Sequence, residues 1–217
     1  VEFATRVMAD KALWDDFGPL CFHSWWSENI SDSEFERIAA LAKAWERPVW
    51  CSELGFDAMA HRTKGMNKTW DYGMRFAVIS YRMMKFAQVE VSQYWTWQNN
   101  YEIMSSDLEE KYPSYFVTRH HVRFLNNGTQ VIHTLSSDEN ILPLAGIHPD
   151  GKKVLHIINR YKKPVAIQVS GWDAGKIDQV STTENQLWET YENTGKTSNG
   201  MVTLELKPES VNTFIIQ

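Results

Sequence analysis

Apolar residues recur every three or four positions in four stretches of the first 125 residues, which is the spacing of an amphipathic helix. The four stretches are residues 2–16, 31–47, 69–86 and 112–125. Ser31 and Glu34 have the spacing of a capping box, and Pro48 ends the second stretch. Thr69 is the expected N-cap of the third. The pattern therefore predicts four helices in this half of the chain.

Three short apolar runs lie between these helices, at residues 18–26, 48–56 and 89–97, and we interpret them as strands. Their apolar residues occupy adjacent positions, so both faces of each strand are expected to be buried. Strands that alternate with helices pair in parallel through right-handed crossovers. The pattern predicts an α/β fold, either an open sheet or part of a (β/α)8 barrel. The long connection over 56–69 is a candidate functional loop.

Beyond residue 128 the pattern changes to short runs that alternate or are rich in β-branched residues, separated by turn signals. The eight runs are residues 129–138, 141–147, 153–159, 164–171, 177–183, 187–192, 201–207 and 211–217. They predict an antiparallel β-sandwich. We therefore expect two domains, residues 1–128 and residues 129–217, with the boundary at the turn Asn126-Asn127-Gly128.

Composition narrows the function classes. The chain has 217 residues, with 22 Lys and Arg against 27 Asp and Glu, and no basic block. Nucleic acid and anionic membranes are therefore poor partners, and no apolar stretch reaches the ~20 residues of a membrane span. Cys21 and Cys51 do not form a disulfide framework and are expected to be buried in strands. Eight of the ten tryptophans precede residue 100, and sugar rings stack on such side chains.

Polar and aromatic residues gather at the carboxyl ends of the three predicted strands. Residues two apart share a strand face, so Glu53 follows Val49 and Cys51, while His23 follows Cys21. Trp95 takes the same position on the third strand. In α/β folds ligands bind at this edge. The sequence therefore predicts that His23, Glu53 and Trp95 point into a common hollow.

The order of these features resembles a known family. A His-bearing strand, a Glu-Leu-Gly strand (Glu53 to Gly55), a Trp-bearing strand and then an all-β sandwich are similar to the C-terminal half of a clan A retaining glycoside hydrolase, with family 30 the nearest fit. The resemblance implies a partial (β/α)8 TIM barrel, formed by its last three βα units, followed by a β-sandwich. It implies a substrate that is an oligosaccharide or glycoside, and no cofactor or metal. A secreted or periplasmic location is also implied.

The resemblance assigns roles to particular residues. Glu53 matches the nucleophile, His23 a residue that orients the nucleophile or the sugar, and Trp95 an aromatic platform. Further candidates for substrate binding are Trp25, Trp26, Trp97 and Asn99. A carboxylate nucleophile attacks the anomeric carbon and is later displaced by water, so it must stay ionised, and a nearby hydrogen-bond donor helps.

The sequence departs from the family at the second carboxyl group. A retaining enzyme needs an acid/base residue about 5–5.5 Å from the nucleophile. In this clan it belongs to an Asn-Glu pair on the fourth strand, and the chain contains no Asn-Glu dipeptide. Glu28, Asp57 and Glu102 follow the three strands but match no known pattern. We therefore expect an inactive fragment that needs the missing N-terminal half of the barrel, or a second chain.

Two other functions stay open. In the first, the protein is a non-catalytic carbohydrate-binding or scaffold protein whose sandwich is the working part, with Trp172, Trp188 and Tyr191 as contacts. In the second, it is an open α/β enzyme of another class. The pair His120-His121 is not expected to bind metal, because adjacent helical residues diverge by about 100° and no second ligand motif occurs.

Overall fold

The computed structural model of the chain describes residues 1–97, 101–171, 175–196 and 201–216. Within it the chain divides into two compact units. The first unit comprises residues 1–64 and 79–102, and the second comprises residues 65–78 and 103–217. The division into domains at residues 128 and 129 stays a prediction.

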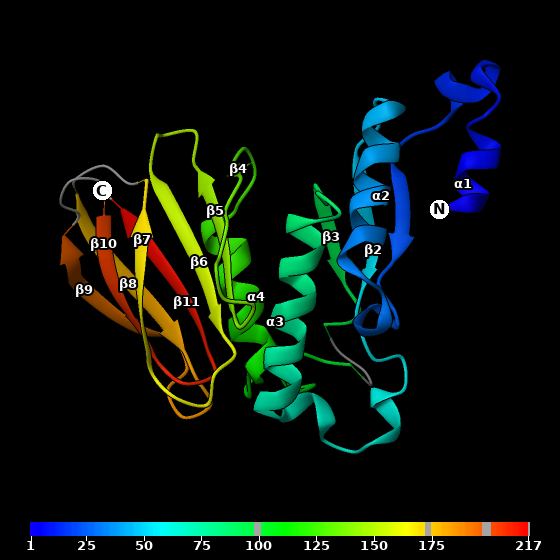
Figure 1. The fold of residues 1–217 in the computed structure, drawn as a ribbon. Helices are drawn as coiled ribbons and strands as arrows, with labels where there is room; N and C mark the ends of the chain where they lie inside the picture. Colours follow the sequence, from blue (N-terminus) through cyan, green and yellow to red (C-terminus); the bar gives the residue numbers. More distant parts are fainter. Residues whose placement is uncertain (98–100, 172–174, 197–200, 217) are drawn as a thin grey trace. The chain divides into compact units, whose positions relative to one another are not determined.

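The first unit contains a three-stranded parallel sheet in the order β1-β2-β3. Helix α2 packs beside β2 (Figure 1), and its buried face carries Phe35, Ala39 and Ala42. The elements that begin in this unit are α1 (Glu2–Val7), β1 (Leu20–His23), α2 (Asp32–Ala44), β2 (Val49–Leu54) and β3 (Val91–Tyr94), with 3-10 helices at Lys11–Asp16, Ser27–Asn29 and Ala60–Arg62. Parallel pairing of the three predicted strands is therefore confirmed.

The single helix predicted over 2–16 is wrong. It is divided into α1 and a 3-10 helix, because the Asp10 carboxylate accepts a hydrogen bond from the backbone N–H of Ala12 (3.0 Å) and starts a new turn. The Trp14 indole N–H then donates to the Met8 carbonyl (2.9 Å), where the first segment ends.

Burial of the parallel strands on both faces was expected, but even in β2 only one face is fully buried, at Val49 and Cys51, while Trp50 and Ser52 are partly exposed. Cys51 is fully buried, whereas Cys21 on β1 and Val91 on β3 are exposed. The prediction that Cys21 is a buried thiol is therefore wrong. The reason is position in the sheet: β1 and β3 are its two edges in the described structure, so only β2 has a neighbour on each side.

The second unit contains two antiparallel sheets. Six strands follow the order β4-β5-β6-β11-β8-β9, and β10 pairs with β7. The strands are β4 (Gln130–Ile132), β5 (Ile141–Ile147), β6 (Lys153–Asn159), β7 (Val165–Ser170), β8 (Lys176–Thr182), β9 (Glu189–Lys196), β10 (Met201–Leu206) and β11 (Ser210–Ile216). Each of the eight runs predicted beyond residue 128 corresponds to one of them.

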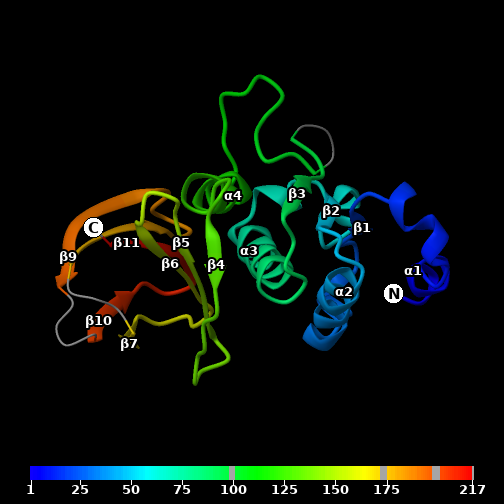
Figure 2. The same cartoon turned by 90° about the horizontal axis from the view of Figure 1, so that it is seen from above.

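The core of the second unit lies between its two sheets. Figure 2 shows β7 and β10 as a separate layer beside the larger sheet, and Phe214 of β11 and Leu204 of β10 are buried between them. Helix α4 (Pro113–Phe124) packs on the larger sheet, where His120 contacts Thr213, the neighbour of Phe214. Successive side chains of a strand point to opposite faces, so β11 carries the sandwich core on one face and α4 on the other.

The two predicted helix caps have different outcomes. At the start of helix α3 (Trp70–Lys85), Thr69 accepts a hydrogen bond from the backbone N–H of Tyr72 (3.2 Å), so this cap is confirmed. Ser31 is the N-cap of α2 but makes no side-chain cap bond, and its hydroxyl instead contacts that of Ser33 (2.8 Å). The predicted capping box at Ser31 is therefore wrong.

These two sites form a matched pair for a stability test. We expect Thr69→Ala to lower the free energy of unfolding by about 1 kcal/mol, because it removes a cap bond, while Thr69→Ser keeps it. Ser31→Ala should stay within about 0.5 kcal/mol of the original chain. Urea unfolding followed by circular dichroism measures both changes. Equal losses at the two positions would contradict the assignment of the caps.

Candidate active site at the ends of β1 and β2

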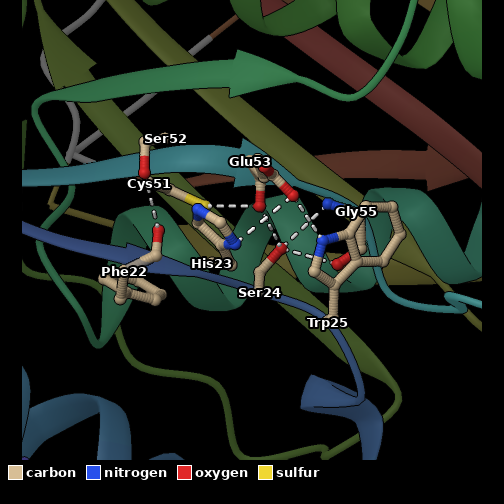
Figure 3. A network of polar contacts seen from close by, with 8 residues as sticks. All are labelled: Phe22, His23, Ser24, Trp25, Cys51, Ser52, Glu53 and Gly55. Carbon is tan, nitrogen blue, oxygen red and sulfur yellow. Dashed lines mark hydrogen bonds and ion pairs between the residues drawn. The ribbon is translucent and has the colours of Figure 1, made fainter.

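A small polar network lies at the carboxyl ends of β1 and β2 (Figure 3). The Glu53 carboxylate accepts a hydrogen bond at Oε2 from the Trp25 indole N–H (2.8 Å), and His23 Nδ1 lies 3.3 Å from the same oxygen. The Glu53 side chain is 25% exposed, so the carboxylate can be reached from outside. The structure thus brings together three of the residues that the sequence singled out.

Ser24 joins the two strand ends beneath this carboxylate. Its backbone N–H donates to the Glu53 carbonyl (3.0 Å), and its buried hydroxyl donates to the Gly55 carbonyl (2.6 Å) and accepts from the Gly55 N–H (2.9 Å). A buried hydroxyl that both donates and accepts a hydrogen bond fixes the backbone segments that it joins. Glu53 therefore projects from a backbone that is fixed across two strands.

Strand β2 contains a bulge at the residue pair that carries the carboxylate. Cys51 pairs with Phe22 on β1, and the next pair is Glu53 with His23, so Ser52 has no counterpart. On the other side, β2 also has one residue more than β3 between successive pairs. A bulge interrupts the two-residue alternation and redirects a side chain. Alternation from Val49 and Cys51 is therefore not sufficient to predict the direction of Glu53.

Three of the predicted aromatic residues are more exposed than the Glu53 side chain. Trp26, Trp95 and Trp97 are 51%, 44% and 54% exposed. The Trp95 backbone N–H donates to the Leu54 carbonyl (3.1 Å), so this residue follows β3 beside the end of β2. Asn99 lies outside the described residues. These indoles offer apolar surface near the site, and their contact with a sugar stays a prediction.

Sequence reasoning did not identify Tyr101. Its ring lies 5.2 Å from that of Trp25, and its hydroxyl donates to the Ala58 carbonyl (2.6 Å) and lies 2.9 Å from His61 Nδ1. Ala58 and His61 belong to the 56–69 loop that the sequence marked as functional. No local pattern points to Tyr101, because its contacts come from segments that only the fold brings together.

The sandwich residues considered as sugar contacts are engaged within the protein. The Trp188 ring stacks on Phe124 (centroids 5.9 Å apart, 9° between planes), and the Arg119 guanidinium lies 3.9 Å from its centroid. The Tyr191 hydroxyl contacts the Lys207 ammonium group. Trp172 lies outside the described residues. A carbohydrate-binding role for the sandwich is therefore not favoured.

Helix α4 buries a histidine cluster that is structural in character. His120 Nδ1 lies 2.7 Å from the Thr213 hydroxyl and its Nε2 lies 2.9 Å from that of Thr182, while His156 Nδ1 lies 2.8 Å from Thr213. Burial lowers the pKa of His120 and His156 well below the usual value and that of His121 to about 4. Among the residues that the structure describes, no group of three or more His, Cys, Asp or Glu side chains is placed to bind a metal.

Chemically, the residues of Figure 3 present one carboxylate at the rim of a parallel sheet, and its Oε2 is held by the Trp25 indole N–H and approached by His23 Nδ1. Such a group can act as a nucleophile or as a base.

Within the described part of the chain, no helix is long and apolar enough to cross a membrane.

A family model matches the C-terminal part of the chain. Residues 128–214 match the model of the glycosyl hydrolase family 30 beta sandwich domain. No curated protein sequence matches the chain.

Solved structures extend the similarity to almost the whole chain. A GH30 endoxylanase from Clostridium papyrosolvens C71 superposes with a TM-score of 0.80 at 18% identity over 96% of this chain and 51% of its own. A GH30 subfamily 8 xylanase, Xyn30A from Clostridium acetobutylicum, gives 0.71 at 17% identity over 81% and 44%. SrfJ from Salmonella typhimurium gives 0.70 at 15% identity over 100% and 44%. The chain thus spans about half the length of these proteins.

Proposed function

We propose, from the premise that this chain is a family 30-like glycoside hydrolase in its fold and in the sequence of its sandwich, that it carries the nucleophile of a retaining β-glycosidase. The nucleophile is Glu53. The observation that carries this proposal is the position of its carboxylate at the end of β2, held by the Trp25 indole N–H and beside His23.

The proposed reaction has two displacements. A Glu53 oxygen forms a bond to the anomeric carbon while the glycosidic C–O bond breaks, and an acid/base carboxyl group protonates the departing oxygen. The same group then removes a proton from water, which attacks the anomeric carbon and releases Glu53. His23 orients the nucleophile or the sugar, and the exposed indoles of Trp26, Trp95 and Trp97 supply surface for stacking on sugar rings.

The acid/base group, in this proposal, lies on a segment outside these 217 residues. Among the residues drawn in Figure 3, Glu53 carries the only carboxylate, and the chain spans about half the length of the family 30 structures it resembles. In the described structure, β1 and β3 are the two edge strands of the parallel sheet, and Val91 on β3 has an exposed side chain. Further strands pairing with these edges would complete a (β/α)8 barrel, with residues 1–128 as its last part and residues 129–217 as the sandwich.

The substrate in this proposal is a β-linked oligosaccharide or glycoside. Two of the similar structures are xylanases by name, which makes a xylo-oligosaccharide the first compound to test.

A mechanism-based label tests the proposal. We expect a 2-deoxy-2-fluoro glycoside with a good leaving group to form a stable ester with Glu53 when the chain is joined to the N-terminal segment that would complete the barrel. The fluorine slows both displacements, and the good leaving group restores the rate of the first one only, so the ester accumulates. Mass spectrometry of peptic peptides locates the ester. Residues 1–217 alone are the control and should stay unlabelled, since in this proposal they lack the part of the barrel that would hold the glycoside against Glu53. A label on any other carboxylate would refute the assignment of Glu53.

A further inference from the structure

Trp25 contacts the proposed nucleophile through its edge. Its indole N–H is 2.8 Å from Glu53 Oε2, and Figure 3 shows the ring lying between the ends of the two strands, beside Gly55. His23 Nδ1 approaches the same oxygen, at 3.3 Å. Within the described part of the chain, both nitrogens thus meet Oε2, and no hydrogen bond reaches Oε1.

The indole is held in this position from two sides. A Cβ added to Gly55 would lie 2.4 Å from Cζ3 and 2.5 Å from Cη2 of Trp25, so only glycine allows the ring to come so close. On another side lies the ring of Tyr101, whose hydroxyl is tied to the Ala58 carbonyl. Glycine at residue 55 is therefore explained by this close approach.

An indole N–H is a donor only and does not titrate in the physiological range. A carboxylate held by such a donor keeps one orientation at every working pH. Because the ring already packs against Gly55 and Tyr101, sugar stacking is left to the more exposed tryptophans.

We infer that Trp25 is a positioning residue that holds Oε2 of Glu53 and leaves Oε1 as the atom that attacks the anomeric carbon. This inference rests on the proposed function. When the Oε1–carbon bond forms and the leaving group departs, Oε2 becomes the carbonyl oxygen of the ester and still faces the indole N–H. Tyr101 and Gly55 act through Trp25 by fixing its ring.

The contact itself can be tested on residues 1–217 without any activity. In ¹⁵N-labelled protein, Glu53→Gln should move the Trp25 indole N–H resonance and speed its hydrogen exchange, because the acceptor loses its charge. The Trp70 indole donates to the Glu209 carbonyl (3.0 Å) and is the internal control, expected to stay unchanged. If Glu53→Gln left the Trp25 indole resonance unchanged, the inference would be overturned, whatever reaction the protein catalyses.

The role is tested in the completed barrel. Trp25→Phe keeps a ring but removes the donor, so kcat should fall about tenfold to a hundredfold while KM stays within about twofold. Gly55→Ala, which forces the ring away, should give the same pattern. Trp14→Phe is the matched control, since it also removes an indole hydrogen bond, to Met8, and should change neither constant. A rise in KM with unchanged kcat in Trp25→Phe would instead assign Trp25 to substrate binding.

The outcomes separate the two proposals. If Glu53→Gln is fully active, the proposed function fails, and the positioning role fails with it. If Glu53→Gln is inactive and Trp25→Phe matches the original enzyme, only the positioning role fails.

Discussion

Replacing Glu53 by glutamine is expected to lower kcat at least about a thousandfold, when it is measured on a protein in which the N-terminal segment completes the barrel. An amide has the shape of the carboxylate and can still accept the Trp25 N–H, but it cannot form the glycosyl ester. The fold should be retained, because the side chain is partly exposed and its backbone is held by Ser24. Steady-state kinetics on an aryl glycoside measures the loss, and circular dichroism checks the fold.

Azide distinguishes a nucleophile from an acid/base group. In Glu53→Ala, azide can enter the vacated space and attack the anomeric carbon from the nucleophile's side, so the product should be a glycosyl azide of inverted configuration. A retained azide would mean that Glu53 is the acid/base residue. Glu36→Gln, at an exposed position of α2, is the control for a lost carboxylate and should keep full activity. Full activity in Glu53→Gln would refute the mechanism.

The second large effect is acid destabilisation of the sandwich. His120, His121 and His156 are gathered between α4 and the larger sheet, and burial lowers the pKa of each. Like-sign interactions with His121 and, for His120, with Arg119 lower the pKa of His120 and His156 further. The folded state therefore keeps these three imidazoles neutral where the unfolded chain, with a pKa near 6.5, is protonated.

The sign follows from proton counting. Below about pH 6.5 the unfolded state binds more protons than the folded state, so the free energy of unfolding falls as pH falls, and above that pH these groups have no effect. Each group contributes about 1.4 kcal/mol per pH unit within its window, so three give a limiting slope of about 4 kcal/mol per unit. The folded-state pKa of His121 is about 4, so its contribution to the slope ends near that pH. Such a slope would remove most of a typical domain's stability within two pH units.

Hydrogen exchange of peptides from β6, β8 and β11 between pH 7 and 4.5, combined with urea, measures this slope for the sandwich. We expect His121→Phe to reduce it by about one third, because one titrating group is lost while a ring is kept. The exposed His133 gives the control, since His133→Gln should leave the slope unchanged. Equal stability of the sandwich at pH 7 and pH 5 would contradict the account.

Much of the fold could be predicted because its signals are local. Helix α3 follows the apolar spacing after Thr69, and the alternating or β-branched runs beyond residue 128 became eight strands. This works because burial of one face requires a fixed spacing along the chain. The exceptions are also local in origin: Asp10 restarts a helix, and the Ser31 hydroxyl contacts Ser33 instead of a backbone N–H.

The sequence by itself determined that a carboxylate, Glu53, ends a strand beside a His-bearing and a Trp-bearing strand, and that a sandwich follows. Only the tertiary structure decided how that carboxylate is held. The bulge at Ser52, the Ser24 hydroxyl, the indole of Trp25 over Gly55 and the ring of Tyr101 meet from separate segments. Likewise His120 and Thr213 meet across 93 residues of chain. Such contacts depend on where the fold brings backbone segments together, and the spacing of residues along a single element carries no information about them.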